Sequence, residues 1–493
     1  MTILQKIKSA KSNLLLIAIW LIFSILFSYH KTVFNPPLSV HQGAQADRAS
    51  IAYNFFKTNS NFFEPRVMET GTKDGITPSE FPIVSYISAL FYKIFGFNDF
   101  WYRFVVWCFM SFGFWCAVQI IKIFENSKIL SLIIASCWYF GTVLCYYTNN
   151  FLPDIASLSL MLYGIYRYQV IQTQNSTLNK VLFTIAITLS CLIKITSLIF
   201  VISLLLCQTY FYIKNKKKTT IFTESIIVFI IVFSWYYYCI NLEKQVGGSY
   251  FLMKIEPSQN LAEFVKNFDI FFSNWFLKIY NIAQWILIGL GLAVLFFTNI
   301  KKEIKLFTFI SIIGCLAFYA LMSNQFRFHD YYIITFMPIM LFLIISAYKF
   351  LEKLNKTIAI FIIFSIGFWG MIDAKNGVRL RYSKGNYWYQ TFFEPQNFIG
   401  TNDWLKKNGI DENKKIFVAF DENPNVMLYM FKRRGYRVFD HNQLYVEEKI
   451  KITGNLITSN SSRFFKQYPA MIDKLELASQ YKDWKLFKIK NGN

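Results

Sequence analysis

Charged residues are scarce in this chain of 493 residues, where they make up 16% of the sequence. A soluble globular protein usually carries about a quarter. Histidine occurs only four times, too seldom for a zinc centre built from several imidazoles. The composition therefore excludes an ordinary soluble enzyme and argues against a histidine-rich metal site.

The sequence also lacks three patterns that are common in other classes of protein. All eight cysteines fall inside hydrophobic runs without metal-ligand spacing, whereas a disulfide framework would place them in aqueous loops, so we expect them to be packing residues. The polar C-terminal part contains no Gly-x-Gly-x-x-Gly motif or phosphate loop, which leaves nucleotide binding without support. No internal repeat of the kind found in many transporters is visible.

Hydrophobic residues make up 54% of the chain, and apolar runs near the length of a membrane span recur through its first three quarters. These runs predict a polytopic α-helical membrane protein with about eleven transmembrane helices. The expected spans are about 12–29, 99–124, 129–147, 152–170, two short spans within 181–213 that turn near Lys194, 221–240, 279–298, 306–322, 331–350 and 357–372.

Basic residues explain the orientation that we expect. The net charge of +22 arises largely from lysines in short loops between the spans, which mark the cytoplasmic side, so it does not indicate nucleic-acid binding. The pattern predicts a cytoplasmic (inner) membrane protein with a cytoplasmic N-terminus, attracted to anionic membrane lipids. The first apolar run has no convincing cleavage site and is expected to be retained.

Hydropathy falls after Asp373, which predicts two domains. Residues 1–372 form the transmembrane domain, with a long first outer loop at about 30–82 and a short interfacial helix at 82–95 that stops at Gly96. Residues 373–493 form a small extracytoplasmic α/β domain. Its expected helices are 397–407 and one that Asn423 caps; its expected strands are 415–420, 436–439, 456–459 and 484–489.

The first outer loop contains the best candidates for catalysis, Asp47 and Glu80. An acid on such a loop is commonly a solvated charge. Asp47, however, precedes the amphipathic stretch 49–56, which we expect to lie on the membrane surface. A carboxylate there could accept a proton from an attacking hydroxyl or amine, with partial burial tuning its pKa. Glu80, between two prolines, could serve as a second acid or as a helix cap.

Several cations are expected near the outer face, where a lipid phosphate would lie: Arg66, Arg103, Lys194 and Arg327. Guanidinium groups suit phosphate because they offer two parallel donors, although taken individually each of these residues is more often an interfacial anchor. His329 and Asp330 could orient a phosphate but amount to half a metal site. We therefore predict no metal and no other cofactor, and leave a divalent cation open.

The order of these features resembles a known family. A first membrane helix, a long loop with an early acid, Glu80-Phe81-Pro82, a short helix ending at Gly96, and Phe100-Trp-Tyr-Arg103 follow one another. Further motifs are Pro153-Asp154, Lys194-Ile-Thr196 and His329-Asp-Tyr-Tyr332. Over nearly the whole chain, this order resembles the GT-C membrane glycosyltransferases. The particular likeness is to the bacterial branch of glycosyltransferase family 39, which is protein mannosyltransferase-like and includes relatives of the aminoarabinose transferases.

The resemblance implies transfer of a sugar from a polyprenyl-phosphate donor to a lipid, polysaccharide or protein acceptor on the outer face, normally with inversion at the anomeric carbon. It assigns the role of base, or of acceptor positioning, to Asp47. Substrate and phosphate contacts are expected from His41, Arg48, Arg66, Arg103, Asp154, Lys194, Arg327, His329, Asp330 and Tyr331.

The first-loop motif departs from that of the resembled group. Where the group usually has His-x-Trp-Arg-Gln-x-Asp-Thr, this chain has Gly43 and Ala44 in place of Trp-Arg, and Arg48 in place of Thr. Arg48 is an alternative phosphate contact. Two other classes of function stay open, namely a transporter (flippase) of lipid-linked sugars and a non-catalytic scaffold of the cell envelope.

Overall fold

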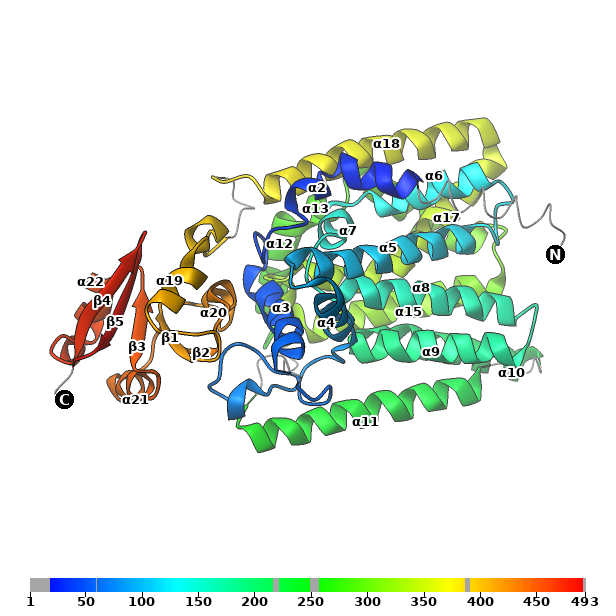
Figure 1. Ribbon diagram of the computed structural model, residues 1–493. Helices are drawn as coiled ribbons and strands as arrows, with labels where there is room; N and C mark the ends of the chain where they lie inside the picture. Colours follow the sequence, from blue (N-terminus) through cyan, green and yellow to red (C-terminus); the bar gives the residue numbers. More distant parts are fainter. Residues whose placement is uncertain (1–17, 59, 216–220, 249–256, 386–390, 491–493) are drawn as a thin grey trace. The chain divides into compact units, whose positions relative to one another are not determined.

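The computed structural model describes residues 18–58, 60–215, 221–248, 257–385 and 391–490. The chain forms two compact units, each built from three segments of the sequence (Figure 1). We call the first the membrane unit; it comprises the described residues of Met1–Val33, Arg103–Tyr237 and Met253–Leu380. We call the second the sheet unit; it comprises those of Phe34–Tyr102, Tyr238–Leu252 and Arg381–Asn493.

The regular secondary structure in the described part of the membrane unit consists of helices. Its elements, three of which have one end in the sheet unit, are α2 (Tyr29–Thr32), α5 (Asp99–Ile121), α6 (Lys128–Tyr139), α7 (Thr142–Tyr147), α8 (Asp154–Ile171), α9 (Thr177–Ile193), η2 (Ile195–Ser197), α10 (Leu198–Asn215), α11 (Phe222–Val246), α12 (Leu261–Phe271), the π-helical turn η3 (Phe272–Phe276), α13 (Leu277–Ile279), α14 (Ile282–Val294), η4 (Leu295–Phe297), α15 (Lys302–Leu321), α16 (Ser323–Phe326), η5 (Asp330–Phe336), α17 (Met337–Leu354) and α18 (Lys356–Arg381).

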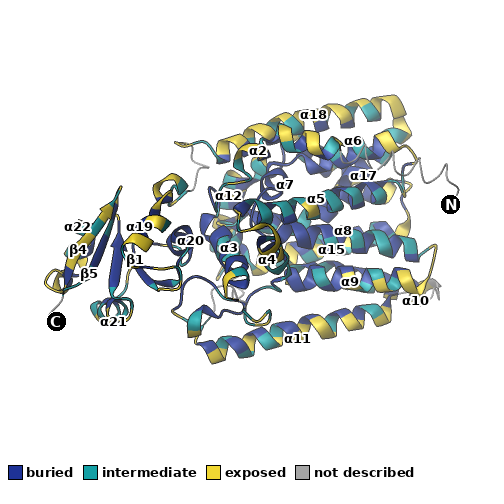
Figure 2. Ribbon diagram, viewed as in Figure 1, coloured by how far each residue is buried: buried dark blue, intermediate teal, exposed yellow. Residues whose placement is uncertain are grey.

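Within the described residues, six helices are long and apolar enough to cross a membrane, and a seventh span results if two helices bent by 102° count as one. Long helices such as α11 and α18 expose apolar side chains, which Figure 2 shows as exposed faces. Phe361 on α18, for example, is 70% exposed. Because only a hydrocarbon solvent accommodates so much exposed apolar surface, the prediction of a polytopic membrane protein is confirmed.

The predicted number of about eleven spans exceeds these six or seven. Part of the expected first span, residues 12–17, lies outside the described residues, and α6 and α9 are shorter than a full crossing. The predicted break near Lys194 is confirmed, since α9 ends at Ile193. The span expected at 129–147 is instead divided between α6 and α7. Gln284 stabilises this break by donating to the carbonyl oxygens of Cys137 and Phe140 over 2.9 and 3.0 Å.

The sheet unit contains a five-stranded mixed sheet in the order β2-β1-β3-β5-β4. Strand β1 runs parallel to β2 and β3, whereas β5 is antiparallel to β3 and β4. The elements of the unit are α3 (Gln42–Lys57), η1 (Lys73–Gly75), α4 (Ile83–Phe95), η6 (Pro395–Phe398), α19 (Thr401–Lys407), β1 (Ile416–Ala419), α20 (Val426–Phe431), β2 (Gly435–Val438), α21 (Gln443–Thr453), β3 (Asn455–Thr458), α22 (Ser461–Gln467), η7 (Pro469–Met471), β4 (Leu475–Tyr481) and β5 (Trp484–Ile489).

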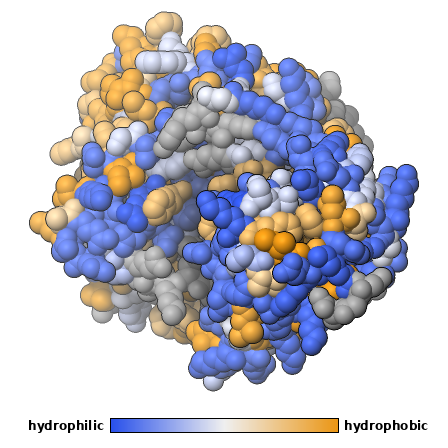
Figure 3. All heavy atoms as spheres, turned by 90° about the vertical axis from the view of Figure 1, so that its left-hand side faces the viewer, coloured by the Kyte–Doolittle hydropathy of each residue, from blue (hydrophilic) through white to orange (hydrophobic). Residues whose placement is uncertain are grey.

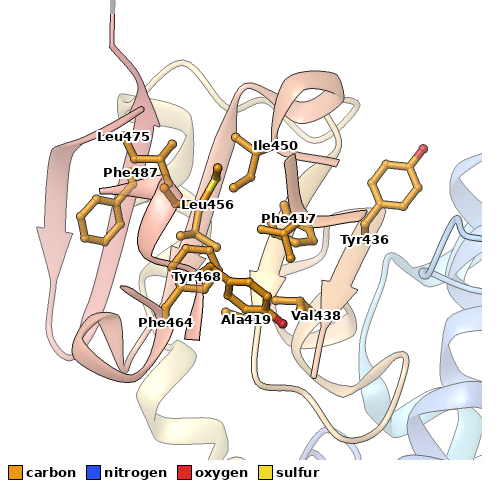
Figure 4. Packing of buried hydrophobic residues seen from close by; sticks show 12 residues of the cluster. Phe417, Ala419, Tyr436, Val438, Ile450, Leu456, Phe464, Tyr468, Leu475 and Phe487 are labelled. Atoms are coloured by element: carbon orange, nitrogen blue, oxygen red, sulfur yellow. The ribbon is translucent and has the colours of Figure 1, made fainter. Parts of the chain in front are cut away.

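A hydrophobic core packs against one face of this sheet. Phe417, Leu456 and Phe464 are fully buried in it, and Figure 4 shows their side chains packed between the strands and the flanking helices. Viewed from the side of β4 and β5, hydrophilic residues predominate on the surface (Figure 3). The helices α11 and α18 instead expose apolar side chains. The prediction of a small α/β domain is confirmed.

The first loop of the chain adds to the edge of this sheet. The backbone amide of Thr70 donates to the oxygen of Gly435 over 2.7 Å, and the amide of Gly435 donates to Met68 over 3.0 Å. A Cβ on Gly435 would lie 2.7 Å from the backbone nitrogen of Ile416, so only glycine permits this close packing of three chain segments. Residues early and late in the sequence therefore share one folded unit. The predicted domain boundary at 372/373 stays a prediction; α18 continues past it to Arg381.

Two local predictions are wrong, and one strand was missed. The stretch 49–56 does not lie on a surface, because residues 49–55 of α3 are buried inside the sheet unit. The helix expected to begin after Asn423 begins at Val426, because the carboxylate of Asp421 holds the preceding turn by accepting from the backbone amides of Asn423 and Met427. Strand β4 was not predicted; its alternating exposed side chains, typical of an edge strand, left no apolar run to recognise.

Candidate functional site

Asp47 lies on α3, whose first residues are fixed by hydrogen bonds within the sheet unit. His41, half-buried, precedes the helix with a φ of 58°. Gln42 is fully buried; its Oε1 accepts from the backbone amides of Phe392 and Phe393 over 2.8 and 3.1 Å. Because a side-chain amide anchored in this way cannot rotate freely, the first turn of α3 is held in place, and Asp47 with it.

The Asp47 carboxylate lies in a largely dry environment, with its side chain 16% exposed. Its Oδ1 accepts a hydrogen bond of 2.8 Å from Nδ2 of Asn425, and Nη1 of Arg48 lies 3.8 Å from its Oδ2. Burial raises the pKa of Asp47 to about 6, although Arg48 and the Asn425 hydrogen bond favour the charged form. A carboxylate with such a pKa is mostly ionised at neutral pH and still a useful proton acceptor.

Arg48 joins the two acids that the sequence indicated. Its Nε and Nη2 donate to the two oxygens of Glu80 over 2.8 and 3.1 Å, in the bidentate geometry of the strongest ion pairs. Glu80, in turn, contributes to the raised pKa of Asp47 by like-charge repulsion. The structure therefore brings Asp47, Arg48 and Glu80 together in one charged cluster.

A second buried acid, Asp421, belongs to the same unit and was not predicted. Burial raises its pKa to about 7, and the negative charge of Asp47 contributes to the same shift. Nη1 of Arg437 donates to its backbone oxygen over 2.8 Å. Asp421 thus shapes the turn at 421–427, which carries Asn425 to the Asp47 carboxylate.

A weak signal in the sequence marks Asp421 and Asn425, two residues that were not predicted. A run of acidic and amide side chains, Asp421-Glu-Asn-Pro-Asn425, directly follows the buried strand β1. We interpreted this run only as the start of a helix. It also explains the departure at Gly43, because a Cβ there would lie 2.6 Å from Cγ of Asn423. The side chain of Asn423 thus occupies the space that a side chain at position 43 would need.

A separate group of predicted residues lies in the membrane unit. Nζ of Lys194, at the end of α9, is 3.3 Å from Oδ2 of Asp154, at the start of α8. The same ammonium lies 5.7 Å from the ring centre of Tyr331. The pair borders a cavity of about 20 Å³, room for about one water molecule. Residues lining this cavity include Ser157, Ser197, Thr335 and Pro338.

Asp330, His329 and Tyr331 also belong to this group. Asp330 is fully buried and accepts a hydrogen bond from the hydroxyl of Tyr147. The ring of His329 lies 5.3 Å from that of Tyr331. The motif at 329–332 thus meets the ion pair of Asp154 and Lys194, two residues that the sequence indicated separately, through Tyr331. Tyr147 was not predicted, and nothing in the apolar run around it marked it.

Arg66 and Arg103 belong to neither of these two groups of residues, and each has partners of its own. Arg66 forms an ion pair with the exposed Asp74, which Arg434 also binds over 2.8 Å. Arg103 is fully buried; its Nε donates to the backbone oxygen of Asn149 over 3.2 Å. These contacts give Arg66 a place in a surface ion-pair network and Arg103 a role in holding a turn.

Arg327 contacts α12 in the membrane unit. Its Nη1 donates to Oδ1 of Asn267 over 3.4 Å, and its backbone oxygen accepts from Trp275. Within the part of the chain that the structure describes, no group of three or more His, Cys, Asp or Glu side chains is arranged to hold a metal ion. The role of Arg327 in phosphate binding and the absence of a cofactor stay predictions.

About one third of the chain is similar to a known protein family. Residues 78–238 match the model of the family described as dolichyl-phosphate-mannose-protein mannosyltransferase. No curated protein matches the sequence. The family model covers the segment from Glu80 through Lys194, and it agrees with the resemblance to the GT-C membrane glycosyltransferases, which is confirmed.

Solved structures of low sequence identity share the fold. The structure of ArnT from Cupriavidus metallidurans bound to undecaprenyl phosphate has a TM-score of 0.63 at 10% identity and matches over 97% of this chain and 98% of that one. The oligosaccharyltransferase from Archaeoglobus fulgidus in the apo form has a TM-score of 0.53 at 10% identity, over 93% of this chain and 72% of that one. This chain therefore has the GT-C fold over nearly its full length.

Proposed function

We propose that this protein is a membrane glycosyltransferase that transfers a sugar from a polyprenyl-phosphate donor to a cell-envelope acceptor on the extracytoplasmic face. The family model and the fold support this class of enzyme. The neighbouring ArnT structure holds undecaprenyl phosphate, which supports a donor of that lipid class. The sheet unit would then lie outside the cytoplasmic membrane, as the positions of the basic loops indicate.

The observation that carries this proposal is the environment of Asp47. A buried carboxylate with a pKa of about 6, held by Asn425 and beside the Arg48–Glu80 ion pair, has the properties of a general base. Asp47 accepts the proton of the acceptor hydroxyl or amine. The acceptor atom forms its bond to the anomeric carbon, while the bond from that carbon to the phosphate oxygen breaks.

The leaving polyprenyl phosphate needs a cation, and Lys194 is the candidate of the membrane unit. Its ammonium is paired with Asp154 and lies near Tyr331, in a region of low water content where a fixed charge acts strongly on developing negative charge. Lys194 would bind the phosphate of the donor, and Asp154 would hold the ammonium in place. No resident metal is part of the proposal, and removal of divalent cations with a chelator tests this point.

The decisive experiment is mass spectrometry of envelope glycolipids and polysaccharides from cells that lack the gene and from cells complemented with the wild type, Asp47→Asn or Glu422→Gln. Glu422 is an exposed acid beside Asp421 and serves as the matched control. We expect one sugar modification to depend on the wild type and on Glu422→Gln. Full modification by a stably inserted Asp47→Asn variant would contradict the role of Asp47. A lipid-linked sugar that accumulates without any transfer product would favour the transporter alternative.

A further inference from the structure

The sheet unit contains a cavity of about 300 Å³ that includes none of the cluster residues Asp47, Arg48 and Glu80. This volume is at the lower end of the range for small-molecule sites, roughly 300–1,000 Å³. The cavity is lined more by polar than by apolar surface and is partly open to solvent. Its lining residues are Glu69, Gly71, Thr72, Gly247, Gly248, Arg437, His441 and Tyr445.

The chemistry of the lining is that of a site for hydroxyl groups. Glu69 is almost fully buried and accepts from the amide of Gly71 over 2.7 Å. Arg437 contributes hydrogen-bond donors. The rings of His441 and Tyr445 stack, with their centres 4.2 Å apart and their planes at 21°. Carboxylate, guanidinium and a stacked aromatic pair together match a sugar ring, which offers hydroxyl groups and a weakly polar C–H face.

Electrostatics favours a neutral, polar ligand over a strongly charged one. The cavity carries one acid and one base, Glu69 and Arg437. Burial and the nearby positive charge of Arg437 lower the pKa of His441, so its ring is mostly neutral at pH 7. An apolar lipid chain would leave these polar groups without water, which is unfavourable.

A hydrogen-bonded connection links the cavity wall to Asp47. The side chain of Asn425 accepts from the backbone amide of Glu69 over 2.9 Å through its Oδ1, and donates to Asp47 over 2.8 Å through its Nδ2. Arg437, on another wall, donates to the backbone oxygens of Asp421 and Glu422. A ligand in the cavity would therefore lie against the residues that fix the position of Asp47.

We propose that this cavity binds a sugar residue of the acceptor, and that this sugar stacks on the ring of His441, which Tyr445 supports from its other face. That the bound sugar belongs to the acceptor rests on the proposed function. That the cavity binds a sugar does not. The inference narrows the acceptor from lipid, polysaccharide or protein to a saccharide-containing molecule. It also makes His441 a determinant of specificity for the acceptor.

The test is saturation-transfer difference NMR on the full-length protein in detergent, with the methyl glycosides of glucose, galactose, mannose and N-acetylglucosamine as probes. Acetyl-serine amide and acetyl-threonine amide represent a protein acceptor. We expect at least one glycoside to receive saturation at its ring protons, and the amides to receive none. Saturation of the amides alone, or of no probe, would overturn the inference.

Variants locate the binding. His441→Ala should reduce the glycoside signal at least fivefold, whereas His441→Phe, which keeps the stacked ring, should retain most of it. Glu448→Gln, an exposed change on the same helix α21, is the control. A signal unchanged in His441→Ala would place binding elsewhere and refute the assignment. An equal thermal midpoint for the three variants shows that they are folded.

The two proposals fail in different ways. If no glycoside binds while envelope modification still depends on Asp47, the acceptor site is wrong and the transferase stands. If a glycoside binds in a His441-dependent manner while Asp47→Asn transfers fully, the catalytic assignment is wrong and the saccharide site stands.

Discussion

The side-chain amide of Asn425 donates a hydrogen bond of 2.8 Å to Oδ1 of Asp47, a residue 378 positions earlier in the chain. This bond stabilises the ionised form of the carboxylate, whereas burial and the charge of Glu80 oppose it. The protonation of Asp47 near neutral pH therefore depends on identifiable neighbours, and each of them can be changed separately.

Removing this hydrogen bond should make the enzyme more sensitive to acid. In Asn425→Ala the pKa of Asp47 rises, because a donor to the charged form is lost; a hydrogen bond to a charged group contributes about 1.5–3 kcal/mol. The acidic limb of the pH–rate profile should move to higher pH, with a several-fold loss of transfer at pH 6. Asn413→Ala, an exposed amide, is the control. An unmoved acidic limb would show that Asp47 is not the group that titrates.

Glu80→Gln should shift the same profile in the opposite direction. The charge of Glu80 raises the pKa of Asp47, so its removal lowers that pKa and releases Arg48 to interact with Asp47. We expect the acidic limb of the pH–rate profile to move to lower pH, whatever the change in maximal rate. A shift to higher pH would mean that Glu80 supports the ionised base in a way that the ion-pair geometry does not explain.

A side chain at position 43 should destabilise the sheet unit. A Cβ on Gly43 would lie 2.6 Å from Cγ of Asn423, and overpacking of this kind costs about 1–3 kcal/mol. Gly43→Ala should lower the thermal midpoint, and Asn423→Gly should restore it in the double variant. If the two changes lower the midpoint additively, the side chains do not compete for the same space.

The site was predictable in part, for a physical reason. Asp47 and Glu80 were recognisable because acids in a long polar loop contrast with the surrounding apolar sequence. Asn425 and Asp421 were not, because their roles arise from a contact between segments far apart in the chain. The pairing of Arg48 with Glu80 also needed the fold, since nothing in two loop positions 32 residues apart specifies a bidentate contact.

Single and double variants of Asp154 and Lys194 should distinguish the contribution of this ion pair to stability from its contribution to catalysis. Lys194→Gln or Asp154→Asn alone leaves one mostly buried charge without its main partner and should destabilise the protein by about 3 kcal/mol. The double variant should recover most of the thermal midpoint but not the transfer activity, because the phosphate has lost its cation. Recovery of activity in the double variant would show that the pair is only structural.

Lys432, a buried lysine of the sheet unit, should make the folding stability of the protein rise with pH. The buried ammonium of Lys432 lies 3.4 Å from the ring centre of Tyr429 and 4.4 Å from that of Phe97. Burial lowers the pKa of Lys432 to about 8 from its usual 10.5.

Between pH 8 and 10.5 the unfolded chain therefore binds more protons at this lysine than the folded one does, so folding stability rises with pH. Relative to Lys432→Met, the wild type should gain on the order of 2 kcal/mol across this range. Thermal unfolding of both proteins at pH 7.5, 9 and 10.5 measures the difference, and a constant difference would contradict the lowered pKa.

The fold was more predictable than the site. The apolar runs of the membrane helices, the break at Lys194, and the strands β1, β2, β3 and β5 follow from local hydropathy. Failures occurred where a distant partner decides the outcome. Residues 49–56 were expected to lie on the membrane surface, yet α4 and α20 pack against helix α3 and bury it. Strand β4 exists because β5 offers a partner for its backbone.

The joining of Thr70 to Gly435 has a consequence for how the protein is made. The hydroxyl of Thr70 and the oxygen that accepts from it are 365 residues apart, so the ribosome completes the first partner long before the second. At roughly 5–20 residues per second this interval lasts about 20–70 s. During that time the backbone groups of Met68 and Thr70 lack the partner that Gly435 provides in the folded protein. Nascent chains of increasing length can be treated with a protease to test this. The early loop should become protected only in chains long enough to include β2.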